Sequence, residues 1–99
     1  MKTYNFKGRQ VTVKVITTIT PNRIQLTDIS DGTPFAVATS NIPALNSLEG
    51  YVAVKNYSEN EGMLDFLLEN NIVDIPITYV QENYVNFPIC KIKRHTNGY

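Results

Sequence analysis

Alternating apolar and polar residues characterise the N-terminal part of the chain. Val11, Val13 and Val15 are separated by single polar residues, which is the period of a half-buried strand, and the β-branched residues that follow predict a strand over 11–20. Shorter patterns of this kind predict further strands at 3–6, 23–27, 35–39, 50–55, 77–80 and 85–92. Turn residues separate the first strands, so we expect these to pair as an antiparallel meander.

One segment has helical spacing instead. Ser58 and Glu61 form the sequence signature of a capping box, and Asn70 and Asn71 follow the last apolar position. We therefore expect one α-helix over about 58–70. Its apolar side comprises Met63, Leu64, Phe66, Leu67 and Leu68.

Carboxylates occupy the opposite side of this helix. Glu61, Asp65 and Glu69 stack at i, i+4 and i+8, and Glu59 and Tyr57 stand beside them. We call these five residues the acidic helix surface. Its negative charge is suited to docking on a basic protein surface, although solvation alone also accounts for most charged helix faces.

The remaining segments are irregular. Residues 40–49 are interrupted by turn formers and are expected to form a loop or a short turn of helix. Residues 72–76 are expected to be extended, because Pro76 disfavours helix in the residue before it. Pro88, within the last predicted strand, indicates an edge strand or a bulge, since proline donates no ladder hydrogen bond.

Together these elements predict an α+β fold. We expect a curled, mainly antiparallel sheet or a partly open small barrel of about six to seven short strands, with the helix of residues 58–70 packed on it. The long connection through the helix would also permit one parallel strand pair. The 99 residues suit a single domain, expected over 1–93, followed by a frayed tail over 94–99.

Composition points to a cytosolic protein. No apolar run approaches the roughly 20 residues of a membrane span, and the N-terminal residues lack the apolar core of a signal peptide. The single cysteine excludes an intramolecular disulfide and fits a reducing compartment. We therefore expect a cytoplasmic protein without a membrane contact.

Charge is segregated along the chain although the net charge is zero. Five basic residues precede Asp28, nine carboxylates lie from there to Glu82 against Lys55 alone, and three basic residues follow. Pairing across strands would cancel these charges, whereas adjacent basic chain ends would give a dipolar surface. Both arrangements are compatible with the sequence.

Catalytic and metal-binding patterns are not evident. Cys90 and His95 lie five positions apart, and residues at an odd separation face opposite sides of a strand. His95 also belongs to the expected tail, so a catalytic pair is not expected. The segment 28–32 has the Asp and Gly of a calcium loop without its closing Glu, so an Asx-type turn is expected there. The scattered glycines form no phosphate loop. We therefore expect neither an enzyme nor a metal or cofactor site.

A small nucleic-acid-binding barrel is the alternative function. Exposed rings on a curled sheet, with basic residues at both chain ends, would stack bases and hold phosphates. The candidate rings are Tyr4, Phe6, Tyr51, Tyr79, Tyr84 and Phe87. The neutral net charge and the acidic helix surface make nucleic acid the less favoured partner.

Two segments carry a resemblance to a protein group. Residues 54–64 read Val-Lys-Asn-Tyr-Ser-Glu-Asn-Glu-Gly-Met-Leu, and residues 84–90 read Tyr-Val-Asn-Phe-Pro-Ile-Cys. In the second half of the chain this pair resembles small uncharacterised proteins of bacteriophages and other mobile elements. The resemblance implies a cytosolic accessory protein that binds a host or phage macromolecule, with no catalytic residues to assign.

The leading hypothesis is therefore a non-enzymatic, cytosolic protein-interaction module. Its expected partner is a protein with a basic surface that meets Tyr57, Glu59, Glu61, Asp65 and Glu69. Self-association through an edge strand is a further option.

Overall fold

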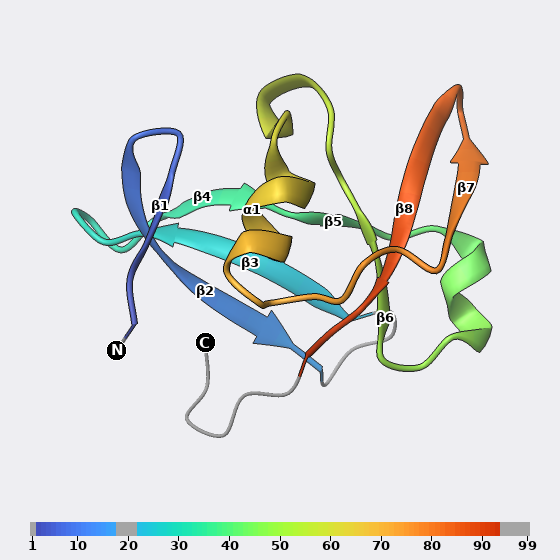
Figure 1. Cartoon of the computed structure of the whole chain (residues 1–99). Helices are drawn as coiled ribbons and strands as arrows, with labels where there is room; N and C mark the ends of the chain where they lie inside the picture. Colours follow the sequence, from blue (N-terminus) through green and yellow to red (C-terminus); the bar gives the residue numbers. More distant parts are fainter. Residues whose placement is uncertain (1, 18–21, 94–99) are drawn as a thin grey trace.

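Two four-stranded antiparallel sheets and one short α-helix form the fold (Figure 1). The computed structural model describes residues 2–17 and 22–93. Sheet one contains, in spatial order, β1 (Tyr4–Phe6), β2 (Arg9–Ile16), β3 (Arg23–Asp28) and β4 (Pro34–Val37). Sheet two contains, in spatial order, β5 (Thr39–Ser40), β6 (Tyr51–Val54), β8 (Val85–Lys91) and β7 (Thr78–Glu82). The predicted α+β class is confirmed, and the described residues form eight strands that do not close into a barrel.

The predicted N-terminal meander is confirmed in sheet one. Val13 of β2 lies opposite Leu26 of β3, and Val15 lies opposite Ile24. Val13, Leu26 and Ile24 are buried, as the alternating pattern requires. β2 ends at Ile16, and the end of the strand predicted over 11–20 lies outside the described residues, as does the predicted tail over 94–99.

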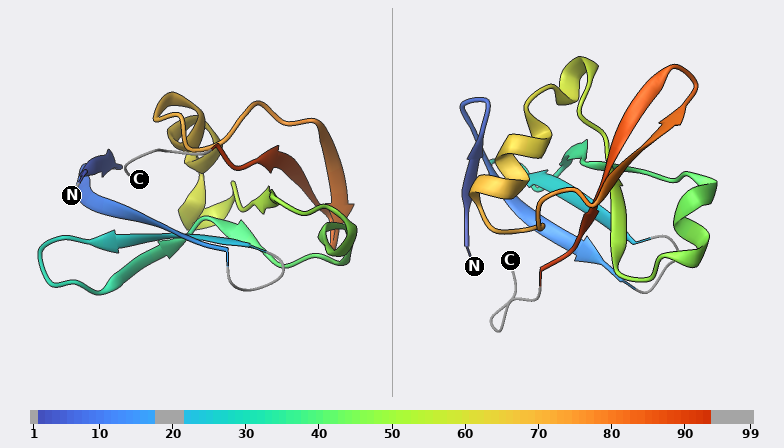
Figure 2. Two further views of the ribbon diagram at one scale, coloured as in Figure 1. Left: turned by 90° about the horizontal axis from the view of Figure 1, so that it is seen from below. Right: turned by 45° about the vertical axis from the view of Figure 1, so that its right-hand side comes forward.

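Ala38 joins the two sheets. Its amide donates to the carbonyl of Ile24 at 2.8 Å, in sheet one, and its carbonyl accepts from the amide of Lys55 at 2.7 Å, at the end of β6. The strand predicted over 35–39 is therefore divided into β4, which pairs with β3, and β5, which pairs with β6. This exchange of partners bends the chain and gives the predicted curl (Figure 2).

Pro88 lies in an interior strand, so the expectation of an edge strand is wrong. β8 is placed between β6 and β7. The amide of Ile92 donates to Gly50, on the β6 side, and every second residue of a strand faces the same neighbour. Pro88 therefore faces β6, but the paired register with β6 ends at Ile89. The paired register stops at Ala53 and Ile89, one position short of the proline, so the missing amide of Pro88 interrupts no paired position of the ladder.

The predicted helix exists, but its expected capping box is wrong. Ser58 begins a separate 3₁₀ helix, η2 (Ser58–Asn60), and its side chain makes no cap hydrogen bond. The α-helix, α1, spans Met63–Glu69. Gly62 at its N-cap has a φ of 91°, a left-handed conformation that glycine adopts without a steric penalty. This glycine separates the two helical segments.

Two asparagines define the ends of α1. The side-chain Oδ1 of Asn56 accepts from the amide of Leu64 at 2.8 Å and so satisfies a donor of the first turn. Asn71 has a φ of 58°, and the amide of Ile72 donates back to the carbonyl of Leu67 at 2.9 Å. These are features of a Schellman motif, and they confirm the predicted C-terminal end.

Sheet two carries apolar residues on both faces. Val52, Val54 and Cys90 face the main core, which also contains the buried side chains of sheet one and α1. Ala53 and Ile89 face a second cluster together with Ile42, Leu45 and Phe87. A short 3₁₀ helix, η1 (Pro43–Ser47), contributes Leu45 to this cluster, in agreement with the short helical turn considered for residues 40–49. α1 lies between β1 and the β7–β8 hairpin (Figures 1 and 2).

Candidate functional site

The carboxylates of the acidic helix surface point outward. Glu59, Glu61, Asp65 and Glu69 are all exposed, whereas Phe66 and Leu67 on the other side of α1 are buried in the main core. Asp65 and Glu69 thus lie on the exposed side of α1 as predicted. Glu59, however, belongs to η2 and Glu61 precedes α1, so the predicted stack at i, i+4 and i+8 is interrupted.

Two members of this surface are held by neighbouring residues. Lys55 lies 3.6 Å from the Glu59 carboxylate, and a hydrogen bond to its own backbone amide, followed by the charge of Lys55, lowers the pKa of Glu59. Tyr57 is half-buried and packs edge to face against Phe87 at a centroid distance of 6.0 Å. Both residues thus have structural roles that the sequence did not reveal.

The other three carboxylates lack such partners. Within the described ranges, the ion pairs involve none of Glu61, Asp65 and Glu69. Like charges spaced four residues apart on a helix destabilise it by a few tenths of a kcal/mol. Asp65 and Glu69 therefore leave uncompensated negative charge on the solvent side of α1, and Glu61 adds an exposed carboxylate just before the helix.

A second surface, not identified from the sequence, lies along the β7–β8 hairpin. Its apolar side chains are exposed to 75% at Ile75, 57% at Ile77, 59% at Tyr79 and 99% at Tyr84. We call these four residues the hairpin surface. Ile75, Ile77 and Tyr79 alternate with other residues as in a strand that faces the core. Only the strand order shows that these side chains are exposed. β7 lies at the outer margin of the molecule (Figure 1).

The backbone of β7 has an open hydrogen-bonding edge. The β8 residues that face β7 are Phe87 and Ile89, which alternate with those facing β6, and they pair with Val80 and Thr78. The amide and carbonyl groups of Tyr79 and Gln81 consequently point away from the sheet. No other described residue forms a hydrogen bond to these groups.

The tip of the hairpin has an unfavourable backbone conformation. Glu82 pairs with Val85, so Asn83 and Tyr84 form a two-residue loop. Their φ angles are 49° and 67°, as a type I′ turn requires. Asparagine tolerates this region, but tyrosine rarely adopts it, and glycine is the usual residue at the second position. The chain therefore places its most exposed aromatic ring on a strained turn.

The acidic helix surface and the hairpin surface belong to a segment without basic residues. Residues 56–90 contain no Lys or Arg. Their six carboxylates are those of Glu59, Glu61, Asp65, Glu69, Asp74 and Glu82. Two of the six are paired with lysines just outside the segment, Glu59 with Lys55 and Asp74 with Lys93, each at 3.6 Å. The exposed apolar edge thus belongs to a stretch of the sequence that carries carboxylates and no Lys or Arg.

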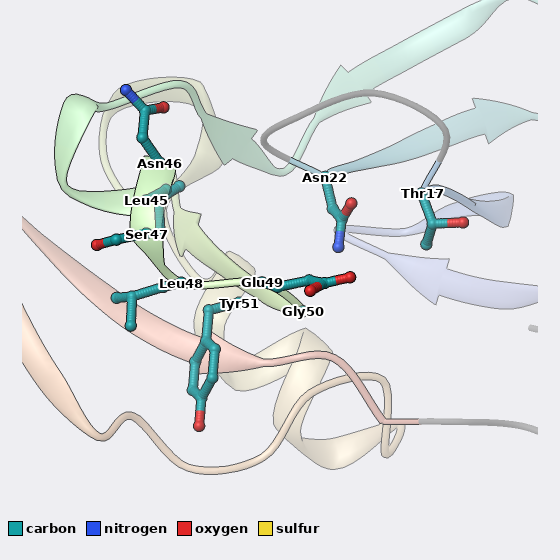
Figure 3. Close-up of a pocket in the computed structure, with 9 residues that line it drawn as sticks. All are labelled: Thr17, Asn22, Leu45, Asn46, Ser47, Leu48, Glu49, Gly50 and Tyr51. Carbon is teal, nitrogen blue, oxygen red and sulfur yellow. The ribbon is translucent and has the colours of Figure 1, made fainter.

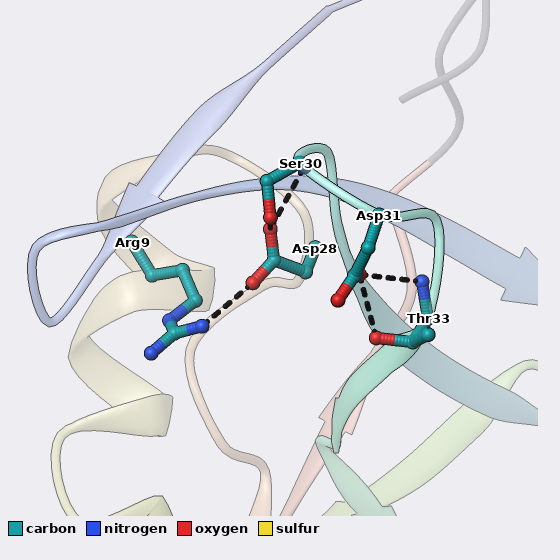
Figure 4. Close-up of polar contacts among 5 residues, drawn as sticks. All are labelled: Arg9, Asp28, Ser30, Asp31 and Thr33. Atoms are coloured by element: carbon teal, nitrogen blue, oxygen red, sulfur yellow. Dashed lines mark hydrogen bonds and ion pairs between the residues drawn. The ribbon is translucent and has the colours of Figure 1, made fainter.

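A contrasting polar cluster closes the β3–β4 turn (Figure 4). The Arg9 guanidinium donates to the Asp28 carboxylate at 2.7 Å, and the amide and hydroxyl of Ser30 donate to it at 2.9 and 2.7 Å. These bonds, with that from Arg9 first, lower the pKa of Asp28 to about 2. Asp31 accepts in the same way from Thr33. The expected Asx-type turn is confirmed, and its two carboxylates accept hydrogen bonds from within the turn and, at Asp28, from Arg9.

The residues considered for catalysis do not assemble a site in the described part of the chain. Cys90 is fully buried, and burial, with a smaller effect of Asp74, raises the pKa of its thiol to about 11. A thiol of this kind is a poor nucleophile at neutral pH. His95 lies outside the described residues. Within ranges 2–17 and 22–93, no three His, Cys, Asp or Glu side chains are grouped to hold a metal ion.

A shallow cavity of about 370 Å³ lies between η1 and the start of β3 (Figure 3). It is lined by Thr17, Asn22, Leu45, Asn46, Ser47, Leu48, Glu49, Gly50 and Tyr51. Glu49 is its one ionisable carboxylate, and no histidine, cysteine or basic residue lines it. Tyr51 is the other titratable side chain of this lining, and the cavity by itself assigns no reaction.

The aromatic rings do not form a common stacking platform. Tyr4, Phe6 and Phe87 are buried, and Tyr51 is half-buried against the second cluster. Of the six candidates only Tyr79 and Tyr84 are exposed. Both exposed rings lie on the hairpin, within the acidic segment, where phosphate groups would be repelled.

No helix in residues 2–17 and 22–93 combines the length and the apolar character needed to cross a membrane. Comparisons of the chain with family models, with curated proteins and with solved structures gave no match.

Proposed function

We propose that this chain is a non-enzymatic protein-interaction module for a partner with a basic surface. The contact region comprises the hairpin surface and the three unpaired carboxylates of the acidic helix surface, Glu61, Asp65 and Glu69. The observation that carries the proposal is the unpaired edge of β7, with apolar side chains exposed beside it. A cytosolic accessory role, as the resemblance to phage and mobile-element proteins implies, forms part of the same proposal.

Exposed edge strands favour a protein partner over a small ligand. Soluble proteins usually protect such edges with charge, proline or a covering segment, because unpaired amides and carbonyls bind other strands. β7 is short and has Pro76 before it, but Ile77 and Tyr79 present apolar groups beside the open edge. Burial of one large apolar side chain contributes about 1.5–3 kcal/mol. Contact with another protein is the arrangement that would bury them.

Charge selects the kind of protein. The segment 56–90 presents carboxylates without a neighbouring basic residue of its own, so its field attracts positive surfaces and repels negative ones. The same field opposes contact with nucleic acid. The buried positions of Tyr4, Phe6 and Phe87 likewise give no support to the nucleic-acid alternative.

The test compares charge-reversed variants in partner capture. Immobilised wild-type protein is used to capture partners from an extract of the cells that express it, and each partner is identified by mass spectrometry and purified. The double variant Asp65→Lys and Glu69→Lys is expected to lose at least tenfold in affinity for the purified partner, with an unchanged melting temperature.

A control variant reverses two charges of the opposite sign on another part of the protein. Lys14→Glu with Arg23→Glu alters two exposed residues of sheet one and should not weaken the affinity. Equal affinity of the Asp65 and Glu69 variant and the wild type would refute the proposal. Retention of the wild type on single-stranded DNA, lost steeply with added salt, would favour the nucleic-acid alternative instead.

A further inference from the structure

We infer that β7 binds an extended, basic segment of the partner as a fifth strand of sheet two. This inference rests on the proposed function and adds to it the mode of binding and the chemistry of the bound segment. It joins three observations, which are the open backbone edge, the exposed apolar residues beside it and the acidic charge around it.

The backbone of β7 is suited to an extended partner segment. Tyr79 and Gln81 each present one amide and one carbonyl on the outer side of β7, two residues apart. A strand that pairs with β7 would present its own amides and carbonyls two residues apart. Its backbone would lie about 4.7–4.9 Å from that of β7. The bound segment must therefore be extended over several residues, since a helix has no unpaired backbone groups along its length.

The side chains of β7 favour apolar residues in the bound segment. Tyr79 lies opposite Pro88 in the sheet, so both project from the face that also carries Cys90. A residue of the added strand opposite Tyr79 would project from this same face and cover the ring. Its neighbours would project from the other face, beside half-buried Val80. Apolar residues at alternate positions of the segment are consequently favoured.

Charge decides between a partner segment and a second copy of this chain. Two copies joined through β7 would bring two acidic segments 56–90 together, each without a Lys or Arg. Their exposed carboxylates would repel each other at low salt. A segment with Lys or Arg between its apolar residues would instead meet Glu82 at the end of β7 and the long-range field of α1. The observations therefore favour a basic partner.

The test uses a defined peptide in place of the natural partner. The probe is a synthetic eight-residue peptide in which lysine alternates with valine, and binding to the full chain is measured by fluorescence anisotropy. We expect saturable binding that is weakened at least tenfold when the lysines are replaced by glutamate. A peptide of the same sequence with N-methylated amides at consecutive residues keeps its charge, but both of its strand edges are blocked, so it cannot complete the ladder. It should also bind at least tenfold more weakly.

A protein variant tests the same edge from the other side. Tyr79→Pro removes an outward amide and leaves the bonds to β8 in place, so the peptide affinity should fall at least tenfold. Gln81→Ala keeps the backbone and should bind like the wild type. The N-methylated peptide addresses the wild-type protein and remains decisive if the proline variant does not fold.

Each contrary outcome has a separate meaning. Equal binding of the N-methylated and unmodified peptides would overturn strand addition and leave the charge-based proposed function standing. No binding of the lysine peptide, with capture of a protein partner that depends on Asp65 and Glu69, would do the same. Self-association in sedimentation experiments that is lost in Tyr79→Pro would assign the edge to a second copy, and so overturn the inference.

Discussion

The outward backbone groups of the edge strands β4 and β7 differ in whether they have hydrogen-bond partners. At β4, the side chain of Asn60, only 2% exposed, donates to the carbonyl of Val37 at 2.7 Å. At β7, the outward groups of Tyr79 and Gln81 have no such donor or acceptor among the described residues. The fold thus contains a means of covering a strand edge and uses it in sheet one. The uncovered edge of sheet two is therefore informative about binding.

The charges show the same contrast. Beside β4, the carboxylate of Asp28 is paired with Arg9 and with Ser30. On α1, Asp65 and Glu69 have no ion-pair partner within the described ranges. Groups that stabilise the fold are satisfied internally, whereas groups available to a partner are left in solvent. Variants in the two regions should therefore affect different properties.

The largest effect is expected at the covered edge. Asn60→Ala removes the donor to Val37 and leaves a carbonyl without its partner, at a cost of about 1–3 kcal/mol in the free energy of unfolding. For a domain of this size each kcal/mol corresponds to roughly 4–8 °C in melting temperature. Urea denaturation monitored by circular dichroism measures the loss.

The matched substitution at the open edge is Gln81→Ala. It removes an exposed side chain that has no described partner, so the free energy of unfolding should change by less than about 0.5 kcal/mol. A similar loss of stability in both variants would show that the two edges are equally important to the fold, and the comparison would fail.

Local patterns in the sequence predicted the elements that depend on neighbouring residues. The alternation at Val11, Val13 and Val15 located β2, and Asn71 marked the end of α1 because left-handed asparagine is a local property. The wrong expectations concern partners that are distant in the sequence. Asn56 caps a helix that begins seven residues later, which the Ser58 pattern did not indicate. Such bonds depend on the path of the chain between them.

Strand order accounts for the other differences. Pro88 was expected at an edge because proline lacks a donor, but the pairing of β8 with β6 ends at Ile89, which makes an interior position acceptable. The exposure of Ile77 and Tyr79 follows from the edge position of β7, which no short-range pattern specifies. The acidic helix surface was recognisable because helical periodicity alone places Asp65 and Glu69 outward. The hairpin surface required the topology.

The next effect is expected in the pH dependence of stability. The pKa of Asp28 is lowered in the folded protein to about 2, chiefly by the hydrogen bond from Arg9, whereas an unfolded aspartate titrates near 3.9. The stabilisation is therefore fully present above about pH 4 and is lost as the pH falls towards 2. Its size is limited because the Arg9 side chain is 54% exposed.

Substitution tests this assignment. Asp28→Asn should lower stability at neutral pH and give a flatter stability profile between about pH 4 and 2. Arg9→Gln should flatten the profile only in part, since the bonds from Ser30 persist. Thermal denaturation across this pH range provides the measurement. An unchanged acid profile in Asp28→Asn would assign the acid sensitivity to other carboxylates.

The smallest effect, at the tip of the open edge, should have opposite signs for stability and binding. Tyr84→Gly relieves a left-handed φ of 67° and should raise the free energy of unfolding by about 0.5–1 kcal/mol, measured by thermal denaturation. The affinity for the purified partner should fall, because the ring is lost. Asn83→Gly is the control, since asparagine already tolerates its φ of 49° and the ring remains. A gain in stability with unchanged affinity would remove Tyr84 from the contact and restrict it to Ile75, Ile77 and Tyr79. A gain together with weaker binding would show that the strained turn holds the ring for its partner.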